Sequence, residues 1–349
     1  MKAISALYEA QKIVFSPFIF QTVYSMIELG ILDAINNSNE GLDFDQISRE
    51  TNVSKYGVTV LVEMAESAGI VDEISPGKFI LSKIGYFILR DEMTQVNLKF
   101  TQDVCYNGLF YLKDSIVDAS PEGLKVFGDW KTIYEGLSEL PPMVKKSWFD
   151  FDHFYSDNSF SDALDVIFKN KPKMIFDIGG NTGKWAIASA NFDSLVQVKI
   201  FDLPGQVKVA KSNIEKIDAI KDRVTFQEID MLNQSSVIPA GADVYWMSQF
   251  LDCFSEHEIE SILLKIKENA SENATIFIME TFLDDQVFPA AKLSLAATSL
   301  YFTAMANGNS RMYSSRTLKY IIEKAGLKCV KEHDLHQDSF HTILEVKLN

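Results

Sequence analysis

Acidic residues stand at the ends of three successive apolar runs, and these carboxylates are the side chains best placed for ligand chemistry. Asp177 lies late in the first run, Asp202 ends the second and Asp230 follows the third. In an α/β fold with parallel strands, ligands bind at the carboxyl ends of the strands. One such acid could simply cap the turn after its strand, but three at successive strand ends favour a ligand site. Carboxylates suit hydroxyl groups and cations, whereas a pyrophosphate needs helix-terminal amides or basic side chains.

The glycine-rich bend Gly-Gly-Asn-Thr-Gly after the first run differs from two common nucleotide-binding loops. Gly179, Gly180 and Gly183 allow a sharp turn and a close approach of the backbone to a ligand. A phosphate-binding P-loop needs Ser or Thr after its lysine, and Trp185 occupies that position here. The spacing also departs from the Gly-x-Gly-x-x-Gly of dinucleotide folds, although a nicotinamide dinucleotide remains an alternative ligand.

These side chains must be positioned by a sheet whose strands alternate with helices. Strands are expected over residues 173–178, 198–202, 224–229, 242–247 and 274–280, with two more within 328–348. Helices are expected over 149–170, 184–190, 256–269 and 315–325, the third opening with the capping-box pair Ser255 and Glu258. This alternation predicts an α/β fold with a Rossmann-like sheet.

Five of these segments together resemble the plant and bacterial S-adenosylmethionine-dependent O-methyltransferases of small aromatic molecules. The matching segments are Asp177-Ile-Gly-Gly-Asn-Thr-Gly183, Phe201-Asp-Leu-Pro-Gly205, Ile229-Asp-Met231, Ser248-Gln-Phe-Leu-Asp-Cys-Phe-Ser255 and Ile278-Met-Glu280. The resemblance extends over nearly the whole chain, including its N-terminal region. It implies a class I methyltransferase sheet, S-adenosyl-L-methionine as cofactor and a small, phenolic methyl acceptor.

The resemblance also implies which residues contact the cofactor. Asp202 is expected to accept both ribose hydroxyls, with Leu203 beside it, and Asp230 and Met231 to hold the adenine. Tyr155 stands where the family usually has methionine, and its ring could back the sulfonium by a cation–π contact or simply pack between helices. The contacts expected at the amino-acid end are Asp177, Gly179, Gly180, Gly183 and Ser248.

The catalytic position departs from the family pattern. The family usually carries His-Asp-Trp after the fourth strand, and its histidine takes the proton of the acceptor phenol. The matching residue here is Asp252, while Glu280 keeps one expected glutamate and Met312 replaces another. Asp252 is therefore the expected proton acceptor or orienting group, with Glu280 near it. His257 and His153 are its rivals.

An ordinary aspartate is a weak base for a phenol. With reference pKa values near 3.9 and 10, the proton transfer costs roughly 8 kcal/mol. Burial beside apolar neighbours could raise the pKa of Asp252, and a more acidic acceptor, such as a hydroxyaryl carbonyl or a carboxylate, would reduce the cost further. Two functions stay open: O-methylation of a small aromatic acceptor, or a cofactor-binding member of the fold that acts as a decarboxylase, hydroxylase or regulatory binder.

Composition limits the remaining possibilities. The 349 residues, of which 47% are hydrophobic and 23% charged, predict two domains with sizeable cores. A net charge of −15 opposes binding to nucleic acid or anionic membranes. The apolar stretch 13–32 approaches membrane length, but Pro17, Gln21 and Glu28 interrupt it. Three scattered cysteines and the absence of a signal-peptide pattern predict a cytoplasmic protein.

Residues 1–142 are predicted to form a mainly helical domain, and residues 143–349 the methyltransferase domain. Helices up to residue 35 and over 42–53 and 54–69, followed by a β-wing over 70–81, form a winged-helix pattern. Lys55 is the only cation on the second helix of this pattern, which disfavours a DNA-binding role. The resemblance implies instead a dimerisation domain that closes the partner's substrate pocket in a homodimer.

Two aromatic-rich segments, 91–150 and the insertion 284–309, supply core residues and candidate walls for a flat ligand. Near the C-terminus, His333, His336 and His341 are irregularly spaced, and no Asp or Cys partner recurs at ligand spacing. The sequence therefore predicts no metal site.

Overall fold

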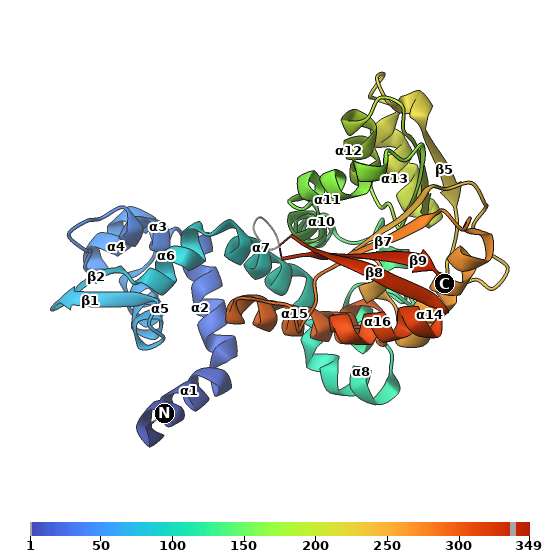
Figure 1. Ribbon diagram of the computed structural model, residues 1–349. Helices are drawn as coiled ribbons and strands as arrows, with labels where there is room; N and C mark the ends of the chain where they lie inside the picture. The colour runs from blue at the N-terminus through green and yellow to red at the C-terminus, as the bar shows by residue number, and fades with distance from the viewer. Residues whose placement is uncertain (1, 336–339) are drawn as a thin grey trace. The chain divides into compact units, whose positions relative to one another are not determined.

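The computed structural model describes residues 2–335 and 340–349, and the chain divides into two compact units, residues 1–99 and 100–349 (Figure 1). The division lies upstream of the domain boundary predicted after residue 142. The reason is packing, because Phe100, Val104 and Leu124 share one buried cluster with Tyr301 and Met305 from the predicted insertion. Residues 100–142 therefore belong to the compact unit that contains the large sheet.

The first unit is mainly helical. Its core includes Met26, Ile31 and Ile47, and Asp43 and Gln46 form a capping box at the start of its fourth helix. Its elements are α1 (Ala3–Val14), α2 (Ser16–Glu28), α3 (Ile31–Asn36), α4 (Phe44–Thr51), α5 (Lys55–Ser67), β1 (Val71–Ser75), β2 (Lys78–Leu81), α6 (Lys83–Arg90) and α7 (Glu92–Phe100), which reaches the division. The order of helices and antiparallel strands is the predicted one. Within the described ranges, no helix is long and apolar enough to cross a membrane.

The second unit begins with short helices that carry many aromatic residues. They are η1 (Thr101–Cys105), η2 (Gly108–Tyr111), α8 (Leu112–Asp118), η3 (Glu122–Val126), α9 (Ile133–Gly136), α10 (Pro142–Asp157), α11 (Phe160–Ile167) and η4 (Phe168–Asn170). The single helix predicted over 149–170 is thus divided. The amide of Asn158 donates to the carbonyl of Phe154 at 3.0 Å, and the Ser159 hydroxyl bonds His341 at 2.7 Å. These side-chain bonds compete with continuation of the helix.

A seven-stranded sheet has the order β5-β4-β3-β6-β7-β9-β8, parallel except at β9, which is antiparallel to both of its neighbours. The strands are β3 (Met174–Ile178), β4 (Gln197–Asp202), β5 (Val224–Glu228), β6 (Val244–Ser248), β7 (Thr275–Glu280), β8 (Leu327–Asp334) and β9 (Thr342–Leu348). The remaining helices are α12 (Lys184–Phe192), α13 (Pro204–Ile214), α14 (Glu256–Asn269), α15 (Pro289–Tyr301) and α16 (Ser315–Lys324), with the short η5 (Lys221–Arg223), η6 (Leu251–Cys253) and η7 (Phe302–Ala306) between them. The predicted Rossmann-like sheet and the capping box of α14 are confirmed.

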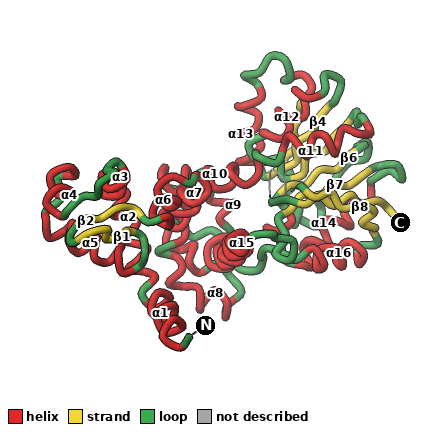
Figure 2. The backbone as a smooth tube through the Cα atoms, turned by 60° about the vertical axis from the view of Figure 1, so that its left-hand side comes forward, coloured by secondary structure: helices red, strands yellow, loops and turns green. Residues whose placement is uncertain are grey.

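Helices cover both faces of this sheet, as Figure 2 shows. α11, α12 and α13 pack on one face, in a core that includes Trp185 and Trp246, stacked with ring centroids 4.2 Å apart. α14 and α16 pack on the other face, in a core that includes Ile262 and Leu318. The chain runs outward from β3 through β4 to β5 and then returns to β6 on the other side of β3. This reversal opens a crevice at the carboxyl ends of β3 and β6, where such sheets bind ligands.

Two of the three C-terminal histidines take structural positions. His333 bonds Glu345 at 2.9 Å across the β8–β9 pair, and His341 is buried against Ser159. His336 lies outside the described residues. Over residues 2–335 and 340–349, no group of three His, Cys, Asp or Glu side chains could hold a metal ion.

Candidate active site

A cavity of about 340 Å³ lies at the carboxyl edge of the parallel strands. One end is formed by the glycine bend and the loops after β4 and β5. The other end is formed by aromatic side chains of residues 100–155 and of α15. The predicted cofactor residues that line this cavity are Tyr155, Gly179, Asp202, Leu203, Asp230 and Met231. Asp177, Gly180, Gly183 and Ser248 lie outside its lining.

The glycines of the bend are required by close packing. Gly179 has φ +77°, and a Cβ there would lie 2.2 Å from the ring of Phe250, which lines the cavity beside it. A Cβ at Gly180 would lie 2.7 Å from a carboxylate oxygen of Asp177. Gly183 has φ +84°, and its Cβ would meet Ile214 at 2.9 Å. Gly180 and Gly183 thus shape the bend from behind, and Gly179 shapes the surface that a ligand would contact.

Asp202 is held in place by the bend that it faces. Its two carboxylate oxygens accept hydrogen bonds from the backbone N–H groups of Asn181 and Leu203, each at 2.7 Å. Burial raises the pKa of Asp202 to about 6, although these two N–H groups oppose the rise. Behind it, burial and the charge of Asp202 raise the pKa of Asp177 to about 8. Asp177 therefore supports the bend from inside the protein.

Two residues with left-handed backbone flank the crevice between β3 and β6. Asn181 has φ +47° and Gln249 has φ +46°, which is an unfavourable conformation for residues other than glycine. Both line the cavity, and the side-chain carbonyl oxygen of each is buried without a hydrogen-bond partner. Buried oxygens of this kind are free to accept from a ligand. Asn181 could have been found from its place in the glycine bend, whereas the sequence around Gln249 carries no comparable signal.

Asp252 occupies the turn η6 (Leu251–Cys253) directly after β6. The residue is only 6% exposed, lines the cavity, and has its pKa raised to about 6 by burial. The Cys253 thiol donates a weak hydrogen bond to one of its oxygens at 3.5 Å. An aspartate with a raised pKa therefore faces the ligand space at the position where a base was expected.

Glu280, the second predicted catalytic residue, lies behind this turn and not in the cavity lining. One of its carboxylate oxygens accepts from the backbone N–H groups of Phe250 at 3.2 Å and Leu251 at 3.0 Å. Burial, and secondarily the charge of Asp252, raise the pKa of Glu280 well above its ordinary value. Glu280 thus fixes the backbone that carries Asp252.

Neither rival histidine lines the cavity. His257 is exposed at the second position of α14. His153 lies on the same side of α10 as Asp157, which follows it four residues later in the same helix. The neighbouring residue Asp152, which the sequence analysis missed, does line the cavity. Burial and the charges of Asp252 and Asp157 raise its pKa to about 7.

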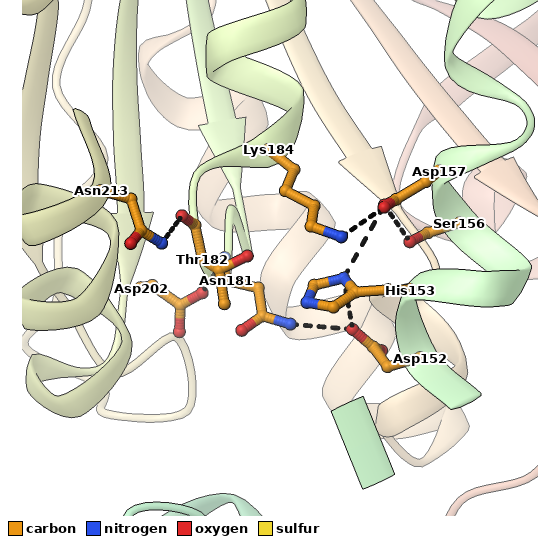
Figure 3. A network of polar contacts seen from close by, with 9 residues as sticks. All are labelled: Asp152, His153, Ser156, Asp157, Asn181, Thr182, Lys184, Asp202 and Asn213. Carbon is orange, nitrogen blue, oxygen red and sulfur yellow. Dashed lines mark hydrogen bonds and ion pairs between the residues drawn. The ribbon is translucent and has the colours of Figure 1, made fainter. Parts of the chain in front are cut away.

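A polar network ties α10 to the glycine bend, as shown in Figure 3. The amide nitrogen of Asn181 donates to Asp152 at 2.9 Å, and the Lys184 ammonium at the start of α12 pairs with Asp157. The His153 ring nitrogen lies 3.7 Å from Asp157. α10 is therefore attached to the bend at two points, which places Asp152 over the ligand space.

The opposite end of the cavity is aromatic. The rings of Phe100 and Phe151 stack with centroids 3.9 Å apart, and Tyr155 lies 4.9 Å from Phe151. The Trp148 ring N–H donates to the Tyr301 hydroxyl at 2.7 Å. These walls suit a flat, largely apolar ligand.

Comparisons with known proteins match two domain families to the chain. Residues 8–79 match the model of a Dimerisation2-like domain, and residues 159–328 match that of an O-methyltransferase domain. The chain is 23% identical over 318 residues to L-tyrosine C(3)-methyltransferase of Streptomyces lavendulae, covering 90% of this chain and 85% of that protein.

Two solved structures share the fold. The mitomycin 7-O-methyltransferase MmcR superposes with a TM-score of 0.73 at 15% identity, covering 99% of this chain and 98% of that one. NcsB1, an O-methyltransferase from neocarzinostatin biosynthesis, gives a TM-score of 0.66 at 16% identity, covering 95% and 96%. Its structure contains S-adenosylmethionine and 2-hydroxy-5-methyl naphthoic acid.

Proposed function

We propose that this chain, which belongs to the S-adenosylmethionine-dependent O-methyltransferases, transfers a methyl group to a hydroxyl oxygen of a small aromatic acceptor. The cofactor, when bound, supplies a methyl group activated by a positively charged sulfur. The observation that carries the proposal is a single cavity that joins acidic strand ends to an aromatic end.

The charges of the cavity support this cofactor over a nicotinamide dinucleotide. Six of the described lining residues are acidic, and none is Lys, Arg or His. A pyrophosphate in such a cavity would meet only like charge, whereas S-adenosylmethionine has a sulfonium, an ammonium and no phosphate. The acidic lining residues are Glu135, Asp152, Asp202, Asp230, Asp252 and Glu258.

The residues around the bend match the parts of the cofactor. Asp202 would accept the ribose hydroxyls, and Asp230 with Met231 would hold the adenine. The unpaired oxygens of Asn181 and Gln249 would accept from the ammonium of the amino-acid end. Ammonium groups donate three hydrogen bonds and accept none, so carbonyl oxygens without a partner suit them.

Asp252 is proposed as the proton acceptor. With a pKa of about 6 against roughly 10 for a phenol, the proton transfer costs roughly 5 kcal/mol, compared with roughly 8 for an ordinary aspartate. Burial thus removes about 3 kcal/mol of the cost, which is why a carboxylate can serve where histidine is usual.

The test is product formation. Purified protein is incubated with S-adenosylmethionine and a panel of mono- and bicyclic phenols, and methylated products are sought by mass spectrometry. Fragmentation then distinguishes a methyl group on oxygen from one on carbon, the position named for the Streptomyces relative. If the protein binds NADH but not S-adenosylmethionine in calorimetry, the cofactor assignment is wrong. If it binds S-adenosylmethionine and yields only C-methylated products, the proposal that oxygen accepts the methyl group is wrong.

A homodimer formed through the first unit is part of the same proposal. The Dimerisation2-like match covers residues 8–79, and large apolar side chains of α1 and α2 are exposed there, among them Ile13 at 75% and Phe18 at 65%. Apolar groups exposed together usually mark an interface. Light scattering at micromolar concentration should therefore give twice the 39.4 kDa of one chain.

A cytoplasmic location is also proposed, supported by three cysteines that form no disulfide.

A further inference from the structure

We infer that the methyl acceptor is an aromatic amine whose ammonium group is bound by Asp152, while Asp252 beside it faces the acceptor hydroxyl. The inference rests on the proposed function and adds the charge of the acceptor to it. Nothing in the family match or in the similar proteins assigns a role to Asp152.

The first argument is the charge balance of the cavity. Its described lining contains six carboxylates and no basic side chain. The cofactor contributes one net positive charge, since its sulfonium and ammonium are offset by one carboxylate. Removing uncompensated charges from water is costly unless a counter-charge is nearby. The loaded cavity would therefore still favour a further cation and disfavour an anion.

The second argument is how the other acids of the cavity are occupied. Asp202 accepts two backbone N–H groups, and Asp230 accepts one from Leu232 at 2.8 Å. Glu258 accepts from the backbone N–H of Ser255 at 2.8 Å. These bonds fix three carboxylates for turns or for the cofactor. Glu135 is exposed at the rim.

Asp152 and Asp252 remain, and each is weakly compensated. Asp252 is 6% exposed, and its side chain accepts from the Cys253 thiol at 3.5 Å and from the backbone N–H groups of its own turn, with no cation among these donors. Asp152 accepts one neutral amide hydrogen bond from Asn181. The His153 ring nitrogen lies 3.8 Å from Asp152, but burial lowers the pKa of His153 and so favours its neutral form. The Lys184 ammonium is paired with Asp157, and neither His153 nor Lys184 lines the cavity. The charge of Asp252 disfavours ionisation of Asp152, as expected for two acids that face one small space.

One carboxylate is enough to accept a hydroxyl proton, so the second needs another ligand. The Tyr134 hydroxyl lines the same cavity and is buried, with only the Cys253 thiol as a weak partner, so it can still bond a polar ligand group at this end. Aromatic walls near Asp152 also favour a cation, because ring faces attract ammonium groups. Tyr155 and Tyr301 provide such walls.

The experiment uses three ligands that share ring and hydroxyl and differ in the charge of the tail: tyramine, 4-ethylphenol and 3-(4-hydroxyphenyl)propionate. Their dissociation constants are measured at pH 8 by calorimetry on the full-length protein loaded with S-adenosylhomocysteine. Tyramine should bind roughly tenfold more tightly than 4-ethylphenol, and the propionate roughly tenfold more weakly, because a partly solvated ion pair is worth about that factor. A matched 2-naphthol series with the same three tails extends the test to larger acceptors.

Asp152→Asn should reduce the advantage of tyramine over 4-ethylphenol to about twofold while the affinity for 4-ethylphenol stays the same, because only the charge is removed. Asp150→Asn is the matched control, since Asp150 lies two residues earlier on α10 and pairs with Lys146 outside the cavity. This control should keep the full preference for the cation.

Three results would overturn the inference: tighter binding of the propionate than of tyramine, no binding of the amine in either ligand series, or unchanged tyramine preference in Asp152→Asn. A variant that loses affinity for S-adenosylmethionine but not for its homocysteine product, with the tyramine preference intact, would assign Asp152 to the sulfonium instead. Methylation of 4-ethylphenol without any preference for amines would refute the inference and leave the proposed function standing.

Discussion

Replacing Asp252 by asparagine removes a proton acceptor from the cavity with almost no change in shape. The aspartate is buried in η6 and its pKa is about 6, so at pH 8 it is ionised and ready to accept a proton. Asparagine cannot do so at any pH. If Asp252 is the base, kcat should fall by roughly 10²–10⁴, the range typical of a lost general base.

The structure also predicts what should stay the same. The affinity for S-adenosylmethionine should change little, because Asp202, Asn181 and Gln249 do not bond to Asp252. In the native protein, kcat should rise with pH through about 6, since the carboxylate must be deprotonated to act, and the variant should lose this limb of the profile. Turnover is measured by mass spectrometry on one active acceptor between pH 5 and 9.

Glu258→Gln is the matched control for this change. Glu258 also lines the cavity, but its carboxylate oxygen accepts from the Ser255 N–H, a role that glutamine preserves in a capping box. Its turnover should stay close to the native value. Native turnover and an unchanged pH profile in Asp252→Asn would refute the reasoning, and would mean that the acceptor is ionised before it binds or that another group takes the proton.

Three further changes follow from the same geometry. Asp202→Ala should weaken binding of S-adenosylmethionine and of its homocysteine product alike, by about 1.5–3 kcal/mol in calorimetry. Native affinity in the variant would contradict the ribose-binding role of Asp202. The preference for S-adenosylmethionine over that product should grow between pH 5.5 and 8. Asp252 and Asp152, with pKa values of about 6 and 7, ionise in this range and attract the sulfonium, which the product lacks. A preference independent of pH would contradict this. Gly180→Ala should lower the free energy of unfolding by about 1–3 kcal/mol through its clash at 2.7 Å with Asp177, whereas Gly205→Ala meets no atom within 4 Å and should be tolerated in thermal melts.

The sheet and the acidic end of the cavity could be predicted from the sequence because their signals are local. Unbroken apolar runs predicted the parallel strands, and the acids and glycines after them predicted where the ligand cavity lies. Asp202, Asp230 and Met231 line the cavity as expected. Gly180 was predicted to contact the cofactor, but it faces Asp177 behind the bend. A sequence shows that a turn needs glycine, but it does not show which side of the turn faces the ligand.

Asp152 could not be predicted because its position depends on tertiary packing. The sequence around it is that of an ordinary aromatic-rich helix, with Asp150 a similar acid two residues earlier. Only the attachment of α10 to Asn181 and Lys184 turns Asp152 toward the cavity and leaves Asp150 outside. The division at residue 99 was missed for the same reason, since residues 100–142 gain their core from a segment far along the chain.

Glu280 holds the turn that carries Asp252, the residue proposed as base where the resembled family usually has histidine. Its carboxyl group accepts from two consecutive N–H groups of the turn, so the backbone beneath Asp252 is fixed without any bond to the Asp252 carboxylate itself. Burial, and secondarily the charge of Asp252, raise the pKa of Glu280 well above its ordinary value, so Glu280 resists taking a negative charge next to Asp252. Asp252 accepts from the Cys253 thiol and from N–H groups of its own turn, and burial still raises its pKa toward that of an effective base.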